Sequence, residues 1–258
     1  MARRLLGTDR QRERALQQAL TARVENTVAA AFQRQLVVTM NQAADIVRAG
    51  GSPVTAVEAN SENMRQLLAR TYDTAGTVLA SRLLNQLKSV HGKQWVRKQD
   101  PDMAFQAALQ DFIRTHTQRR LVEIDSTTSD QMLRIVRRGL ADGATLDQIR
   151  DQISSVAPAL SRSRAATIAR TETHSAAQYG HYEAARATEL PLVKEWIAAD
   201  DDRTRDDEWD HVSADGQQRP MAEPFEVSGE NMMQPGDPGA SAGNIVNCRC
   251  GTGYLLED

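Results

Sequence analysis

The sequence predicts a mainly α-helical protein with long N-terminal helices and a small α+β module at its C-terminus. Hydrophobic residues make up 40% of the 258 residues but aromatic residues only 4%, so small aliphatic side chains dominate, as they do in closely packed helices. Long stretches repeat apolar residues at the spacing of one helix face. After Pro191 this spacing gives way to alternation and to segments rich in Gly, Pro, Asp and Asn, which indicates short strands and loops.

The first half of the chain is expected to form three helices. Apolar residues recur every four positions over about residues 8–48, and the sequence AGGSP ends this pattern because two glycines and a proline interrupt a helix. A second stripe over residues 64–90 predicts a second helix, which would pack antiparallel to the first. Asp100-Pro101 is expected to begin a third helix that ends near Val122.

Capping residues predict further helices in the second half. Ser126–Thr128 offer an N-cap for a helix that Gly143 ends, and Thr145 with Gln148 forms a capping box for the next one. A long helix is then expected over residues 161–188. The chain is therefore divided into two regions.

The first region, 1–124, is helical. The second, 125–258, is a domain with helices to about residue 188 and a β and loop module over 190–258. In this module the sequence LVKEWIAA, residues 192–199, alternates as a strand does.

Charge is distributed unevenly along the chain. Residues 190–258 contain 15 acidic and 5 basic residues, a net charge of −10, whereas the whole chain carries −3 and the preceding residues therefore +7. Five arginines give the chain a basic start, which suits bundling or docking on another protein. These are Arg3, Arg4, Arg10, Arg12 and Arg14.

Neither a membrane span nor a disulfide framework is expected. No apolar run approaches the roughly 18 to 20 residues that a spanning helix needs, and the first residues contain no secretory signal. Two cysteines separated by one residue would close a strained ring if they were oxidised. We therefore expect a soluble protein in a reducing compartment.

The helix over residues 161–188 carries polar residues that point to a structural network. Arg170 and His174 lie four residues apart on one face, and Glu172 points to another side. We expect them to lock the helix to the tail, with Arg203 and Arg205 pairing with neighbouring acids. The alternative makes Glu172 or His174 a catalytic acid or base in a cleft.

The two cysteines allow a metal site. On a strand, Cys248 and Cys250 would point to the same face and offer two thiolates to one Zn²⁺. His211 and His174 are the expected remaining ligands. The alternative is that both are small buried residues, since a pair with this spacing is a weaker signal than paired CxxC motifs.

Several motifs resemble those of the phage Mu F-like head morphogenesis family. They cover about residues 125–258, roughly half of the chain. The motifs, in order, are SRAATIARTETHSAAQYG at 163–180, Trp196, DDRTR at 201–205, His211, Asp215-Gly216, PGDP at 235–238 and NCRC at 247–250.

The resemblance implies a minor head protein of a tailed phage or prophage. It implies several copies per particle, contact with the portal protein and other capsid proteins, and proximity to packaged DNA. The protein would be assembled in the host cytoplasm and lie in the virion, at the capsid interior or the portal vertex, acting in head assembly, DNA packaging or ejection. It implies no established enzyme activity.

A second hypothesis keeps an enzyme in view. Related tails occur beside toxin domains, so the chain could be a metal-assisted hydrolase or transferase. It would act through Glu172, His174, His211 and the two cysteines. This hypothesis requires bound zinc and a pocket that joins these residues.

Overall fold

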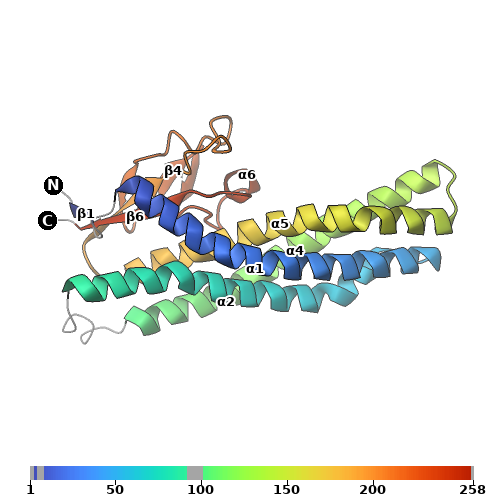
Figure 1. Ribbon diagram of the computed structural model, residues 1–258, viewed down its shortest axis with the longest axis horizontal. Helices are drawn as coiled ribbons and strands as arrows, with labels where there is room; N and C mark the ends of the chain where they lie inside the picture. Colours follow the sequence, from blue (N-terminus) through green and yellow to red (C-terminus); the bar gives the residue numbers. More distant parts are fainter. Residues whose placement is uncertain (1–2, 5–8, 92–100, 257–258) are drawn as a thin grey trace. The chain divides into compact units, whose positions relative to one another are not determined.

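Four long helices and a small sheet region make up the computed structural model, which describes residues 3–4, 9–91 and 101–256 (Figure 1). The prediction of a mainly helical protein with a C-terminal sheet is confirmed. The helices are α1 (Arg10–Arg48), α2 (Val54–His91), α4 (Pro101–Ala141) and α5 (Leu146–Arg186). No helix of the described residues is both long and apolar enough to cross a bilayer.

The chain forms two compact units, and each long helix contributes one part to each of them. The first unit contains residues 1–25, 71–113 and 170–258, and the second contains 26–70 and 114–169. The boundary expected between residues 124 and 125 falls inside α4. The division into regions 1–124 and 125–258 stays a prediction.

α4 corrects the expected helix end near Val122. The helix continues through Ser126–Thr128 to Ala141, so these residues do not form an N-cap. The Thr127 hydroxyl donates a 2.7 Å hydrogen bond to the Glu123 carbonyl, and the Thr128 hydroxyl a 2.6 Å bond to the Ile124 carbonyl. A hydroxyl that bonds the carbonyl four residues earlier is compatible with a helix interior.

α5 begins at the predicted capping box rather than at residue 161. The Thr145 amide donates to Gln148 Oε1 at 2.8 Å, and the Gln148 amide donates to Thr145 Oγ1 at 3.3 Å, which confirms the reciprocal cap. Gly143 adopts a φ of +75° just after α4, the left-handed conformation that glycine favours after a helix. Pro158 lies inside α5 without ending it.

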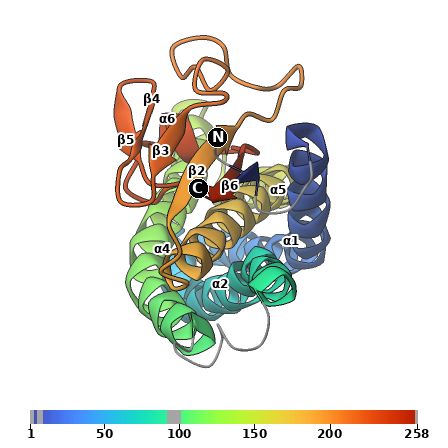
Figure 2. The same ribbon diagram turned by 90° about the vertical axis from the view of Figure 1, so that its left-hand side faces the viewer.

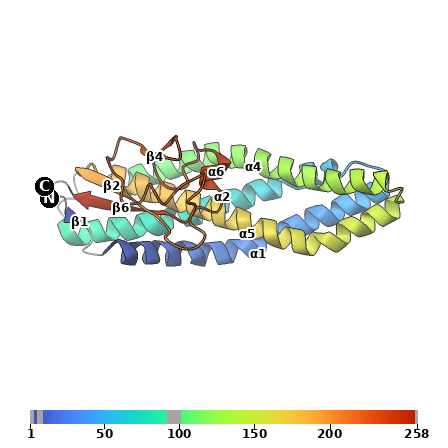
Figure 3. The same cartoon turned by 90° about the horizontal axis from the view of Figure 1, so that it is seen from above.

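In the second unit, parts of all four helices run side by side (Figure 3). Small and flexible apolar side chains fill its core, as the composition predicts. One cluster combines Met40 and Ala43 of α1, Ala56 and Val57 of α2, Met132 of α4 and Ala157 of α5.

In the first unit, α2 and α5 approach each other at two glycines. A Cβ atom added to Gly180 would lie 1.9 Å from the Gly76 carbonyl oxygen, so any side chain there would force the helices apart. Phe112 of α4 stacks on Tyr179 at 4.3 Å between ring centroids and meets Tyr72 edge-on at 5.4 Å. The close approach of the two glycines and the packing of the three aromatic rings therefore hold these parts of α2 and α4 against α5.

A four-stranded antiparallel sheet lies beside the last part of α5 (Figure 2). Tyr254 meets the ring of His181 at 4.9 Å, and Gln17 Nε2 donates to the Thr252 carbonyl at 2.8 Å, so the sheet contacts both α5 and α1. Its strands, in spatial order, are β1 (Arg3–Arg4), β6 (Gly251–Leu256), β2 (Leu192–Ile197) and β3 (Gln218–Pro220). The predicted strand is β2.

A hairpin and a short helix complete the module. Strands β4 (Phe225–Val227) and β5 (Glu230–Met232) pair antiparallel, and α6 (Ala242–Ile245) precedes the cysteines. Cys248 and Cys250 lie in the extended segment before β6, which begins at Gly251. The expectation that they lie on the strand itself is therefore wrong, because Cys250 lies one residue and Cys248 three residues before its start.

The basic start of α1 contacts the acidic module. Arg10 forms ion pairs with Asp215 and, at 3.0 Å, with Glu195, and Arg14 pairs with Asp200 at 2.9 Å. The side chains of Arg3 and Arg4 lie outside the described residues. Opposite charges at the two ends of the sequence thus meet within the first unit.

Candidate functional site

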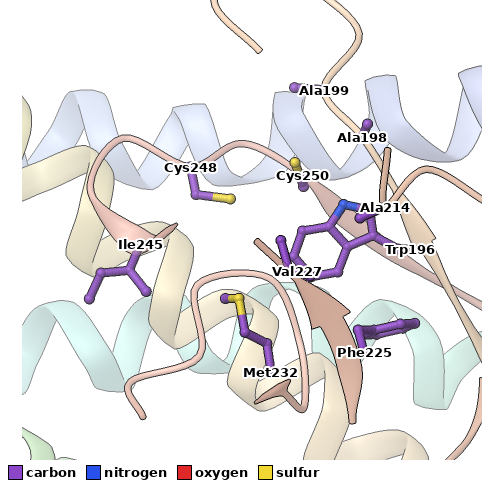
Figure 4. Close-up of a cluster of buried hydrophobic side chains, with 10 residues drawn as sticks. All are labelled: Trp196, Ala198, Ala199, Ala214, Phe225, Val227, Met232, Ile245, Cys248 and Cys250. Atoms are coloured by element: carbon purple, nitrogen blue, oxygen red, sulfur yellow. The ribbon is translucent and has the colours of Figure 1, made fainter. Parts of the chain in front are cut away.

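The two cysteines belong to the apolar core of the C-terminal module. Figure 4 shows Cys248 and Cys250 beside Trp196, with the Cys248 sulfur directed toward Cys250. Each cysteine is only 2% exposed. The Trp196 ring meets the rings of Phe225 and His211 edge-on, at 5.4 and 5.7 Å between centroids. Water is therefore largely excluded from both thiols.

His211 completes a compact cluster with the cysteines. Its Nδ1 atom lies 3.7 Å from Cys248 Sγ and 3.5 Å from Cys250 Sγ, and these three atoms all lie within 4.8 Å of one another. The cluster joins the loop after β2 to the segment between α6 and β6. Because His211 is only 1% exposed, burial fixes this arrangement.

Asn244 fixes the orientation of the His211 ring. Its amide nitrogen donates to Glu230 Oε2 at 2.9 Å and faces the Val227 carbonyl at 3.4 Å, so its Oδ1 atom turns toward His211 Nε2 at 3.1 Å. Only an N–H at Nε2 satisfies this contact. In the neutral ring this places the lone pair on Nδ1, which faces the two sulfur atoms.

The two thiols differ in acidity. The pKa of Cys248 is held well below its usual value chiefly by a hydrogen bond from Cys250, with smaller contributions from the neighbouring His174 and His211. The pKa of Cys250 is raised well above its usual value, because this thiol gives that hydrogen bond and because burial disfavours its charged form.

His174 reaches the same cysteines from α5. It lines a cavity of about 160 Å³ together with Cys248 and Cys250. Its Nε2 atom is buried and has no hydrogen-bond partner among the residues described. A Cβ atom at Gly236, where φ is +70°, would lie 3.0 Å from His174 Cδ2, so glycine leaves room for the ring.

Arg170 and Arg205 hold the turn before Cys248. Arg170 donates to Asn247 Oδ1 at 3.2 Å and to Glu25 at 3.1 Å, and Arg205 donates to the Val246 carbonyl. The Asn247 amide donates to Thr171 Oγ1 at 3.1 Å. Side chains of α5 and of the acidic loop therefore fasten the same two-residue turn.

Arg203 lies among acids, as its sequence context indicates. It pairs with Asp201 at 3.5 Å and Asp202 at 3.9 Å. Arg249, between the cysteines, pairs with Asp201 at 3.0 Å. Arg205 differs from the expectation, because its contact is the Val246 carbonyl rather than a neighbouring acid.

Glu172 faces a different part of the unit. It is 1% exposed and accepts a 2.6 Å hydrogen bond from the Tyr72 hydroxyl of α2. Among the described residues, the cavity walls include His174 and the cysteines but neither Glu172 nor His211. This cavity therefore does not join Glu172 and His211 to His174 and the cysteines, and the enzyme hypothesis stays a prediction.

Sequence reasoning missed the residues that orient the site. Asn244 bonds to His211, and Thr171 bonds to the turn before Cys248, yet in the sequence both look like ordinary polar residues of a loop and a helix. The one available signal for Asn244 was its place four residues before Cys248. Nothing in the periodicity of the chain marks either residue.

These contacts define a helical protein whose acidic terminal module is fastened to α5 through Arg170 and Thr171 and contains a buried cluster of one histidine and two cysteines. Residues 130–252 match the sequence model of the family described as phage Mu protein F like protein. The resemblance is thus confirmed over this segment. It includes His174, His211 and both cysteines.

The family match supports a role in bacteriophage head morphogenesis, with virion association and capsid-related partners. Such a family is usually structural. Comparisons with curated proteins and with solved structures found no match.

Proposed function

We propose that the protein is a minor capsid protein of a tailed phage or prophage, bound to the portal and acting in head assembly, DNA packaging or ejection. The observation that carries this proposal is the match of residues 130–252 to the phage Mu protein F like family. The contacts that hold the terminal module to α5 and α1 support it, because a protein that binds the portal must stay folded when force acts on it.

The contacts of the basic start favour a protein partner over DNA. Arg10 and Arg14 are paired with acids of the module, so their charge is partly neutralised. Binding to DNA depends on cations that are free to contact phosphates. The proposed proximity to packaged DNA therefore needs no direct contact through these two residues.

Quantitative mass spectrometry of purified particles tests the proposal. A phage lacking the gene would be complemented with the wild-type chain, with Trp196→Ala, and with Glu62→Ala as a matched control. Trp196 is fully buried in the module, and Glu62 is an exposed residue of α2. The wild type and the control should enter particles in a few copies and restore infectivity.

Trp196→Ala should abolish incorporation, because it empties the core of the module. Portal binding is tested separately by co-expression with the portal protein of the same phage and size-exclusion chromatography. Absence of the wild-type chain from particles, or failure to co-elute with the portal protein, contradicts the proposal.

The enzyme hypothesis is tested with Glu172→Gln in the same phage. Glutamine keeps the volume of Glu172 and can still accept the hydrogen bond from Tyr72, so this variant should be incorporated and fully infectious. Normal incorporation with loss of infectivity would instead favour a chemical role for the carboxylate.

A further inference from the structure

We propose that the module holds one Zn²⁺ ion, bound by Cys248, Cys250 and His211 and closed by His174 as the fourth ligand. The ion would join the acidic module to α5, since three ligands come from the module and one from the helix. The inference rests on the geometry of the cluster and not on the proposed role in the phage head.

The spacing of the three module ligands fits a tetrahedral ion. With ordinary zinc bonds to thiolate sulfur and imidazole nitrogen, the two ligand atoms lie about 3.6 Å apart. His211 Nδ1 lies 3.7 and 3.5 Å from the two sulfur atoms. Both separations match the edge of such a tetrahedron.

Hydrogen bonds alone explain the cluster less well. The Asn244 contact leaves His211 Nδ1 with one lone pair and no hydrogen. Because Cys250 donates its thiol hydrogen to Cys248, only Cys248 can donate to this lone pair, yet Cys250 Sγ lies as close to it as Cys248 Sγ does. A cation between the three atoms satisfies all of them at once.

The surroundings of His211 are those of a metal ligand. Zinc-binding histidines donate their second ring N–H to a carboxylate or carbonyl group that fixes the tautomer. Here Nε2 contacts Asn244 Oδ1 at 3.1 Å, and Asn244 is in turn held by Glu230 at 2.9 Å. The chain Glu230, Asn244, His211 therefore presents the Nδ1 lone pair to the site.

His174 supplies an independent indication of the fourth ligand. Its Nε2 atom is buried without a hydrogen-bond partner among the described residues, which is costly unless something binds it. The ring lines the cavity that both cysteines line. A site with four protein ligands is closed, as structural zinc sites are.

Metal analysis of the full-length wild-type protein is the first test. Protein purified under reducing conditions without chelator should contain one zinc ion per chain, as measured by inductively coupled plasma mass spectrometry. Replacement by Co²⁺ should give the intense visible bands of a tetrahedral site with thiolate ligands. Less than a tenth of an equivalent of zinc, together with no such bands after Co²⁺ is added to the reduced apoprotein, overturns the proposal.

Variants assign the ligands. Cys250→Ser and His211→Ala should lose the zinc, whereas His116→Gln, a buried histidine of α4 in the second unit, should keep one equivalent. Asn244→Ala should weaken zinc affinity by roughly 10- to 100-fold, as loss of an outer partner does. His174→Ala should weaken it further, because a ligand is lost; unchanged affinity would overturn the role of His174.

Unfolding of a variant must be separated from loss of a ligand. Melting temperatures are therefore measured with and without chelator. The chelator should lower the melting temperature of the wild type and of His116→Gln, but not that of Cys250→Ser, which has no ion to lose. An equal effect of chelator on Cys250→Ser and on the wild type would contradict the assignment.

Discussion

Two histidines of α5 show how the surroundings of a side chain decide its chemistry. His174 lines the cavity beside the cysteines. His181, two turns further along, is 1% exposed, and both of its ring nitrogens lack hydrogen-bond partners among the described residues. Burial lowers the pKa of His181 to about 4; the charge of Glu13 opposes the change and that of Arg82 adds to it.

His181 should make folding sensitive to acid. Its ordinary pKa of about 6.5 applies to the unfolded chain, so between pH 6.5 and 4 the unfolded chain binds a proton that the folded protein excludes. Above pH 6.5, titration of His181 does not change the free energy of unfolding. As the pH falls from 7 to 5, it lowers the free energy of unfolding by about 2 kcal/mol. Urea unfolding at both pH values measures it.

The matched variant is His181→Phe, which keeps an aromatic ring against Tyr254 and cannot titrate. Its free energy of unfolding should fall by about 2 kcal/mol less than that of the wild type between pH 7 and 5. Other titrating groups are common to both proteins and cancel in the difference. Equal losses in the two proteins would show that His181 is not responsible.

Gly180 is the residue at which a single methyl group should matter most. Alanine there would place Cβ 1.9 Å from the Gly76 carbonyl oxygen, and backbone cannot move aside as a side chain can. Gly180→Ala should lower the free energy of unfolding by about 2 kcal/mol or more, despite the roughly 1 kcal/mol that alanine gains in a helix.

Gly139→Ala is the control for this prediction in chemical denaturation. Its added Cβ would meet Ile149 Cγ1 at 2.6 Å, a side-chain atom that can shift by rotation. The cost should therefore be clearly smaller than at Gly180. A Gly180→Ala protein as stable as the wild type would refute the close approach of α2 and α5.

At the scale of secondary-structure elements, replacing two threonines by alanine should have different effects on the free energy of unfolding. Thr145→Ala removes the capping box of α5 and should cost about 1 kcal/mol. Thr127→Ala removes a hydroxyl bonded within α4 and should be neutral or slightly stabilising, because alanine is the better helix former. Thermal unfolding of both variants measures the difference.

The two threonines also test the continuity of α4. If α4 ended near Val122 and a new helix began at Ser126–Thr128, Thr127→Ala would damage a helix start and cost stability as Thr145→Ala does. A destabilisation of similar size in both variants would therefore contradict the continuous helix.

Helix ends could be predicted from the sequence where residues close to the end stop or cap the helix. The glycines and proline after α1 and the capping box of α5 act within a few residues of the ends they mark. The join at Ser126–Thr128 could not be predicted, because the same hydroxyls serve as caps or bond back within a helix. Tertiary packing decides between these two roles, because Thr128 is buried inside the second unit with only 2% of its surface exposed.

The candidate site was predicted by residue type but not by arrangement. The sequence nominated Cys248, Cys250, His211 and His174 as zinc ligands, and the structure brings His211 and the two cysteines together. Their meeting depends on contacts between α5, the acidic loop and the segment before β6, which no local pattern encodes. The contact of Glu172 could not be predicted from the sequence, because its partner Tyr72 lies 100 residues away along the chain.

At the scale of the whole molecule, attraction between the basic start and the acidic module should be measurable. Arg10→Ala removes a pair with the half-exposed Asp215 and one with the buried Glu195. It should lower the free energy of unfolding by more than the roughly 1 kcal/mol of an exposed pair, because the buried Glu195 carboxylate loses a partner. High salt should shrink the difference from the wild type. Denaturant unfolding at low and high salt measures both.

The control for this prediction is Arg12→Ala, which removes an exposed arginine of the same helix turn. It should change the free energy of unfolding by only a few tenths of a kcal/mol. If the Arg12 and Arg10 variants lose the same stability, general charge rather than the specific pairs explains the effect.

The proposed attachment role depends most on the fastening of the acidic module to α5, and amide hydrogen exchange at Asn247 measures this fastening directly. The Asn247 amide donates to Thr171 Oγ1 and the Val246 amide to the Ala242 carbonyl. Both should be protected in the wild type. Thr171→Val should release Asn247 alone. An Asn247 amide that exchanges in the wild type as fast as in an unfolded chain would contradict the account.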